Sequence, residues 1–236
     1  MCLSQDVFKL VGFAFVDDAD LICSGKDAHD VIQSTQCQLD EWRSLMEVTG
    51  GAIETRKSYY YVIDYKKKNG KWKAIDPELG DQGLAVTDKN GVRCSLDRLP
   101  CSKSAEMLGV WMTMDGNRKR QIEELRNKVI QWTSLVRVGK CSQEVIWYSF
   151  KVTISKQIEF VLLAHTFTKE ECRHIMAPAI IIACQKAGYS ARLRCTLRQT
   201  SSDFFGAGAI DLSDGQVLIK FQHWSFTLGK LHPLHR

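Results

Sequence analysis

Two adjacent aspartates, Asp17 and Asp18, are the residues of this 236-residue chain that most directly indicate chemistry. They interrupt an apolar run, with residues 10–16 on one side and residues 19–23 on the other. Apolar flanks around a short polar step are typical of two buried strands joined by a tight hairpin. Carboxylates beside a core are costly unless something binds them, and Mg²⁺ prefers one or two protein carboxylates together with phosphate oxygens. The pair therefore indicates two-metal phosphoryl or nucleotidyl transfer, although aspartate is also favoured in turns because its side chain bonds its own backbone.

The segments that follow the pair predict one helix and several hairpins to hold it in place. Apolar residues recur at helical spacing from Val31 to Met46, and Gly50 with Gly51 ends that run as a glycine cap does. Asn69-Gly70 and Asn90-Gly91 each separate two β-rich stretches, which is a strong hairpin signal. Residues 8–116 are therefore predicted to form an α+β region, in which the helix packs on the sheet that holds the aspartates.

From Arg118 onward the pattern becomes helical. Apolar residues follow one stripe from Ile122 until Gly139, and a second stripe runs over residues 147–162. Thr168 with Glu171 is the sequence signature of a capping box, and it predicts a third helix that continues toward Gly188. The sequence therefore predicts three parts: residues 1–117, a helical domain over 118–198, and a C-terminal extension over 199–236 whose fold it does not indicate.

The charge changes at the same position as the pattern. Residues 1–117 hold 14 Lys and Arg against 18 Asp and Glu, a net charge of −4. Residues 118–198 hold 15 Lys and Arg against six Glu, a net charge of +9, and residues 199–236 are neutral overall. A basic second half behind an acidic, metal-suited first half fits a partner with a phosphate backbone. The alternative is a helical surface that is basic and only solvated.

Composition excludes several classes of protein. No apolar run approaches the roughly 20 residues that span a bilayer, and the first residues lack the pattern of a signal peptide, so no membrane partner is expected. Nine cysteines without any C-x-x-C pair indicate reduced thiols and an intracellular location, in the cytoplasm or nucleus. His165, Cys172 and His174 are close in sequence, but their spacing fits no common zinc pattern.

The order of the motifs resembles the C-terminal half of a reverse transcriptase, the RNA-directed DNA polymerase that retroelements encode. The series consists of an aromatic-x-Asp-Asp hairpin at Phe15 to Asp18, then Gly50-Gly51, Lys57-Ser58 before a strand, and Leu108-Gly109-Val110 before a basic helical domain. The resemblance covers residues 8–165 well and the remainder loosely. It implies half of a polymerase palm in residues 1–117 and a thumb-like domain in residues 118–198.

The resemblance also implies a role for each matching residue and Mg²⁺ as the cofactor. Adjacent strand residues point to opposite sides, so the two aspartates are not equivalent ligands. The resemblance implies that Asp17 binds the catalytic metals and that Asp18 assists from the periphery. Asp20 is expected to be an ordinary strand or turn residue. Lys57 would protonate the leaving pyrophosphate or neutralise triphosphate charge, unless it is only a surface lysine at the start of a strand.

The remaining implied roles concern a primer–template duplex of RNA or DNA. Leu108, Gly109 and Val110 resemble the hairpin that supports the primer end. The basic residues at the start of the helical domain would bind the duplex backbone independently of its sequence. They are Arg118, Lys119, Arg120, Arg126 and Lys128.

In the family, the second palm carboxylate and the fingers come well before the aspartate pair, whereas 14 residues precede Phe15 here. Two-metal catalysis needs that carboxylate on a neighbouring strand, and Asp6 is the sole acidic residue before Phe15. We therefore expect a truncated reverse transcriptase that is inactive alone and that works, if at all, with a complementing N-terminal half. The alternatives are a non-enzymatic nucleic-acid-binding remnant and an unrelated α+β protein in which the aspartates only form a turn.

Overall fold

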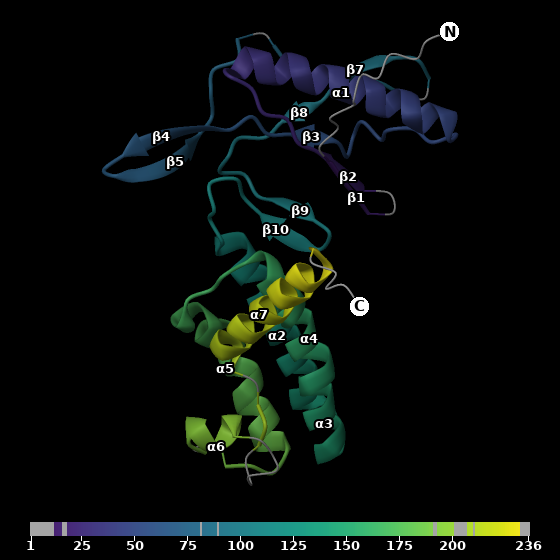
Figure 1. Ribbon diagram of the computed structural model, residues 1–236. Helices are drawn as coiled ribbons and strands as arrows, with labels where there is room; N and C mark the ends of the chain where they lie inside the picture. Colours follow the sequence, from purple (N-terminus) through teal and green to yellow (C-terminus); the bar gives the residue numbers. More distant parts are fainter. Residues whose placement is uncertain are drawn as a thin grey trace, which may run out of the picture. The chain divides into compact units, whose positions relative to one another are not determined.

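The computed structural model describes residues 12–15, 18–80, 82–88, 90–190, 193–200, 207–209 and 211–231 (Figure 1). These residues form an α+β protein, as the sequence predicts. The chain divides into two compact units, Met1–Asn117 and Arg118–Arg236. The division falls where the net charge changes sign, and the second unit includes residues 199–236.

The first unit combines one long helix with short, separate pairs of strands. The helix is α1 (Ala28–Val48). The strands are β1 (Gly12–Phe15), β2 (Asp18–Leu21), β3 (Tyr59–Tyr60), β4 (Asp64–Lys68), β5 (Lys71–Ile75), β6 (Ala85–Thr87), β7 (Arg93–Ser95), β8 (Asp97–Arg98), β9 (Ala105–Met107) and β10 (Val110–Met112). Four antiparallel pairs join strands that are consecutive in the chain, and β3 pairs with β8 in parallel.

The core of this unit lies between α1 and the strand segments. Ile32 and Leu39 of α1 are buried in one cluster with apolar residues of the following segments, namely Val62, Leu84, Val86 and Leu96. Leu21, the last residue of β2, packs against the same cluster. The helix begins where the Asp27 side chain accepts a hydrogen bond from the Asp30 backbone amide. Because Leu21 packs against this core, one end of the β1–β2 hairpin is held in place.

Both hairpins predicted from an Asn-Gly step are confirmed. Asn69 and Gly70 lie between β4 and β5 with φ of 52° and 75°. Positive φ at both central residues is what a two-residue type I′ turn requires, and Asn and Gly adopt it more readily than other residues. Strands β6 and β7 likewise enclose Asn90 and Gly91.

The second unit is helical in the part of it that the structure describes. Its elements are α2 (Lys119–Val138), α3 (Gln143–Ser149), the π-helical turn η1 (Phe150–Ile154), α4 (Ser155–Ala164), α5 (Lys169–Lys186), α6 (Cys195–Gln199) and α7 (Leu212–Leu231). The predicted capping box at Thr168 and Glu171 is confirmed, with both reciprocal hydrogen bonds present at the start of α5. None of the helices within the described ranges is long and apolar enough to cross a membrane.

Two fully buried residues on each of α2 and α5 mark the centre of the helical unit. Leu125 and Val129 of α2 and Ile175 and Ala179 of α5 are at most 1% exposed, and Phe150 of η1 is buried beside the Trp132 ring. Helix α7 lies against α4 and α5 (Figure 1). It occupies the extension for which the sequence predicts no fold.

Candidate functional site

Asp18 lies in an antiparallel hairpin, as the sequence predicts. Strands β1 and β2 are antiparallel, with Phe15 opposite Asp18 and Phe13 opposite Asp20. Val16 and Asp17, which the sequence places between the paired residues Phe15 and Asp18, are outside the described residues. The expected role of Asp17 as a metal ligand therefore stays a prediction, while Asp18 is placed as the first residue of β2.

The hairpin presents a second pair of carboxylates, Asp18 and Asp20. They are alternate residues of one strand, so they lie on the same face of it, about 7 Å apart along the strand. Both are exposed. Partial burial, and then the charge of Asp18, raises the pKa of Asp20. The sequence analysis treats Asp20 as an ordinary strand or turn residue because it considers only the adjacent pair Asp17 and Asp18. The period of two along β2 instead places Asp20 on the same face as Asp18.

Tyr59 lies within electrostatic reach of both carboxylates. Burial, followed by the charges of Asp20 and Asp18, raises the pKa of its hydroxyl, so the phenol stays protonated and able to donate a hydrogen bond. Its ring meets that of Tyr61 edge to face, with centroids 5.8 Å apart. Tyr59 is a residue that the sequence analysis of the site misses. The signal in the sequence is its position two residues after Lys57.

Lys57 ends a turn that leads into β3. Its backbone amide donates to the Glu54 carbonyl at 3.1 Å, and its side chain is exposed. Among the described residues, no hydrogen bond or ion pair joins the Lys57 ammonium to Asp18 or Asp20. Lys57 precedes Tyr59 by two residues, and its side chain is exposed to solvent.

The predicted primer-support segment forms the tip of the β9–β10 hairpin. Leu108 and Gly109 connect Met107 to Val110 with φ of 50° and 80°. A left-handed conformation costs a residue other than glycine about 1–2 kcal/mol, and the Leu108 side chain is 50% exposed. Val110, in contrast, is buried. The segment thus holds a strained, exposed leucine on a tight turn, and such strain is found disproportionately at functional sites.

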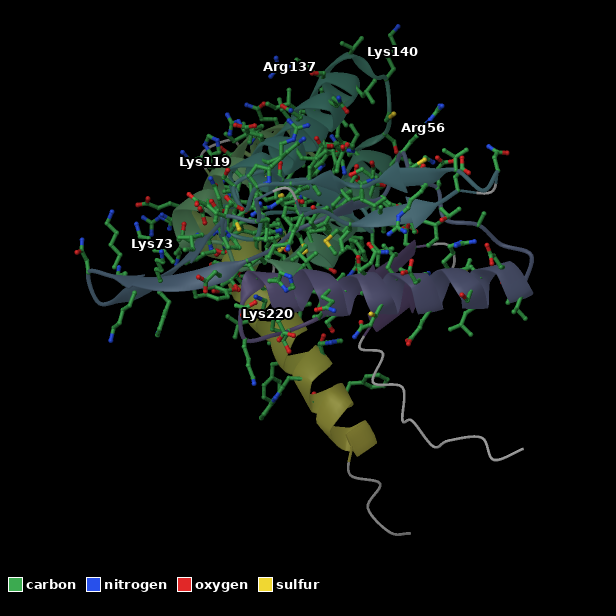
Figure 2. All side chains as sticks on the ribbon, turned by 90° about the horizontal axis from the view of Figure 1, so that it is seen from above. Arg56, Lys73, Lys119, Arg137, Lys140 and Lys220 are labelled. Carbon is green, nitrogen blue, oxygen red and sulfur yellow. The ribbon has the colours of Figure 1, made fainter. Side chains whose placement is uncertain are left out.

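Two of the five predicted duplex-binding residues tie α2 to the α5 region. Arg118 donates to the Thr166 carbonyl and forms an ion pair with Glu171 at 3.5 Å. Arg126 donates to the His174 carbonyl at 2.5 Å. Lys128 faces Glu124 one turn away, at 3.7 Å on the helix surface. Lys119 and Arg120 are exposed at the start of α2, where Figure 2 labels Lys119.

The donor set at the hairpin is suited to a hard cation only in part. Asp18 and Asp20 supply two carboxylates on one face, and Mg²⁺ commonly takes one or two together with phosphate oxygens. In the described part of the chain, no group of three or more His, Cys, Asp or Glu is arranged to hold a metal. A hollow of about 480 Å³ in the same unit is lined by residues that include Tyr60, Leu84 and Arg98, but not by Asp18, Asp20 or Lys57.

The hairpin therefore offers two carboxylates on one face, and the protonated phenol of Tyr59 lies within electrostatic reach of both. Two carboxylates are a number of protein ligands that Mg²⁺ commonly takes together with phosphate oxygens. The chain matches no known protein-family model, no curated protein and no solved structure.

Proposed function

We propose that this chain is part of a reverse-transcriptase-like nucleotidyltransferase, whose reaction is DNA synthesis directed by an RNA template. The observation that carries the proposal is the Asp18–Asp20 pair on one face of β2, next to Asp17 in sequence and to Tyr59 in space. The order of the sequence motifs supports the same conclusion. So does the strained turn at Leu108, which resembles a primer-supporting hairpin.

Each residue has a defined task in this proposal. Asp17 and Asp18 would hold Mg²⁺, and Asp20 lies on the same strand face as Asp18. A bound Mg²⁺ ion neutralises phosphate charge and lowers the pKa of an attacking hydroxyl. Lys57 would neutralise the triphosphate or protonate the departing pyrophosphate. The protonated Tyr59 hydroxyl would donate a hydrogen bond to a carboxylate, and thereby orient it.

Fewer residues of the second unit are assigned to nucleic-acid contact than the sequence predicts. Arg118 and Arg126 already donate to backbone carbonyls of the helical unit. Lys128 faces Glu124 at 3.7 Å, and we assign duplex-backbone contact chiefly to Lys119 and Arg120 because their side chains are exposed. The location we propose is the cytoplasm or nucleus, because the seven described cysteines, buried and exposed alike, are all free thiols.

Catalysis by the 236-residue polypeptide alone is not part of the proposal. Among the described residues, β1 and β2 pair only with each other. Two-metal catalysis needs a further carboxylate on a neighbouring strand, so we expect activity to depend on a complementing segment that supplies it. The complementing N-terminal half is therefore the partner that we propose in addition to the primer–template duplex.

Metal binding and primer extension, measured together, test the proposal. Mn²⁺, a spectroscopic substitute for Mg²⁺, is titrated into the wild-type chain, Asp17→Asn, Asp18→Asn and the control Glu41→Gln, which removes an exposed acid of α1. We expect both hairpin variants to weaken Mn²⁺ binding and the control to leave it unchanged. Equal binding by all four proteins would contradict the proposal and favour an α+β protein in which the aspartates only form a turn.

The extension assay uses a DNA primer on an RNA template with Mg²⁺ and nucleotides. We expect no extension by the polypeptide alone, although the hairpin binds Mn²⁺. Extension that Asp17→Asn abolishes would refute the need for a complementing segment while supporting the proposed reaction. Binding of the primer–template without any Mn²⁺ binding at the hairpin would instead favour a non-enzymatic nucleic-acid-binding protein.

A further inference from the structure

The β4–β5 hairpin is a two-stranded ribbon without a core of its own. Every residue of β4 is exposed, and so are the first three residues of β5. In Figure 1 the ribbon extends sideways, away from α1 and the other strands of the first unit. An isolated two-stranded ribbon is marginally stable in water. The chemistry of its side chains therefore indicates which kind of partner would bind to it.

The charge of the ribbon is opposite to that of the unit that bears it. Residues 64–75 contain five lysines and one aspartate. The rest of residues 1–117 contains nine Lys and Arg against 17 Asp and Glu, a net charge of −8. The positive charge of the first unit is therefore concentrated on this one projecting element, and Figure 2 shows side chains, Lys73 among them, extending from both sides of the ribbon.

The strand register sorts these side chains onto two different faces. Lys66 lies opposite Lys73, and Lys68 lies opposite Lys71. Directly opposed residues share a face, and alternate residues of a strand also share it. One face of the ribbon consequently presents four lysines, which we call the lysine face; Asp64 and Ile75 lie at its base, where the Asp64 carboxylate accepts from the Tyr65 backbone amide at 2.7 Å.

The other face of the ribbon is aromatic. Tyr65 and Trp72 lie on it together with Lys67, because Tyr65 is opposite Ala74 and Lys67 is opposite Trp72. The Tyr65 and Trp72 side chains are 57% and 68% exposed. We call this side, which combines two exposed rings with one lysine, the aromatic face.

The lysine face is unfavourable for the free protein. Like charges directly opposite one another destabilise an antiparallel pair, and here two such pairs are consecutive. None of the four lysines forms an ion pair with a described acidic residue. Anions bound across the lysine face would relieve the repulsion, and the charge pattern therefore favours a polyanion as the partner.

A simpler explanation of lysines on an exposed ribbon is protection against edge-to-edge aggregation. Protection requires charge, but it does not require that charge be confined largely to one face. It also does not explain an exposed Trp72 and Tyr65 on the opposite face, since exposed aromatic rings promote association. Rings of this kind beside lysines are the usual combination for binding unpaired bases and their phosphates.

We propose that the β4–β5 ribbon is a binding site for single-stranded nucleic acid. The lysine face contacts the phosphates of the strand, while Tyr65 and Trp72 stack on unpaired bases where the strand passes over the ribbon edge. Strand residues two apart are about 7 Å apart, so the four lysines cover two to three consecutive phosphates of an extended strand. The site is independent of the reaction proposed above, because binding needs neither metal nor nucleotide.

The test is fluorescence anisotropy of the full 236-residue chain with labelled oligothymidylate of roughly 20 nucleotides, longer than the site of one binding fold, in EDTA across a salt series. Lys66→Gln/Lys73→Gln removes one opposed pair from the lysine face. Half of the four lysines corresponds to about one to one and a half phosphate contacts, and about 0.7 counterions are released per contact on single strands, so the log–log salt slope should fall by about 0.7–1. The electrostatic contribution vanishes near about 1 M salt, so at about 0.1 M salt the variant should bind about 5- to 10-fold more weakly than wild type.

Two matched variants separate the lysine face from total charge and from folding. Lys26→Gln/Lys103→Gln removes the same charge from exposed positions elsewhere in the first unit, and it should change affinity by less than about threefold. Lys66→Arg/Lys73→Arg keeps the charge and should retain binding. Equal losses from the two glutamine variants, or loss in the arginine variant, would overturn the proposal.

The aromatic face is tested with Tyr65→Ala/Trp72→Ala on two probes. Affinity for the single strand should fall by about fivefold or more for each base that loses its stacking partner, while affinity for a blunt duplex should not change. Equal effects on both probes, or binding of phosphatidylserine vesicles in place of the oligonucleotide, would overturn the assignment to single strands.

Discussion

Gln216 is the residue whose removal the structure ties most directly to a measurable loss. It is 8% exposed, on α7, and its side-chain amide makes two hydrogen bonds to the backbone of Phe167. The Phe167 amide donates to Oε1 at 3.0 Å, and Nε2 donates to the Phe167 carbonyl at 2.9 Å. Phe167 is itself 2% exposed, so water cannot readily replace the glutamine.

The size of the effect follows from these two bonds. Gln216→Leu keeps the approximate volume but leaves a buried N–H and a buried C=O without partners, at about 1–3 kcal/mol each. The leucine recovers about 1–2 kcal/mol through apolar burial. Central values of these ranges leave a loss of about 2.5 kcal/mol for the helical unit, a large part of the 5–15 kcal/mol that is typical of a domain.

Amide hydrogen exchange at Phe167 is the most direct assay. A local loss of about 2.5 kcal/mol should speed its exchange about 70-fold, and urea unfolding followed by helical circular dichroism should show the same loss. Gln222→Leu is the control, because Gln222 is exposed on the same helix, and it should stay within about 0.5 kcal/mol of wild type. Equal exchange at Phe167 in the two variants would refute the role given to the Gln216 amide.

Three further predictions concern the first unit and its thiols. Burial and Asp18 raise the pKa of Asp20, so protonated Asp20 contributes stability below its unfolded pKa, and this stability is lost as the pH rises through the folded pKa. Asp20→Asn should therefore raise the free energy of unfolding at pH 7 and leave it unchanged at pH 3. Carboxyl NMR should show that Asp18→Asn lowers the Asp20 pKa. Burial raises the pKa of the Cys101 thiol to about 11. A maleimide at pH 8 should therefore label the exposed Cys37 and Cys141 in the native chain and label Cys101 only after unfolding. Labelling of Cys101 in the native chain would contradict its burial. Gly109→Ala should cost about 1–2 kcal/mol in urea unfolding, purely from its φ of 80°, since a Cβ there would meet nothing within 4 Å; an unchanged midpoint would show that the turn relaxes.

The elements that the sequence predicts well are those with local determinants. Asn69-Gly70 adopts the two positive φ values of a tight hairpin turn, and Thr168 with Glu171 forms the capping box, because each structure needs contacts only within four residues. Helix α7 lacks such a signal. Its residues Phe221, Trp224 and Phe226 are exposed rather than aligned on one buried stripe, so periodicity does not predict it.

The candidate site combines one local relation with one that is not local. Adjacency in the sequence singles out Asp17 and Asp18, whereas the face that Asp18 shares with Asp20 follows from the period of two along β2. That relation is local, and the strand predicted from the sequence already contains it. The effect of both charges on Tyr59 depends on where β3 lies after α1 and a turn have intervened. This second relation has no local determinant, and a single sequence therefore does not predict it.

Net charge is a poor guide to where nucleic acid would bind in this chain. Residues 118–198 carry +9, yet Arg118 and Arg126 direct their guanidinium groups to backbone carbonyls and Lys128 faces Glu124. Residues 1–117 carry −4, yet their β4–β5 ribbon holds four lysines on one face without a described acidic partner. A phosphate binds most strongly to cationic side chains that do not already interact with another protein group. The lysine face, in the acidic half of the chain, is therefore an electrostatic footprint that net charge alone does not reveal.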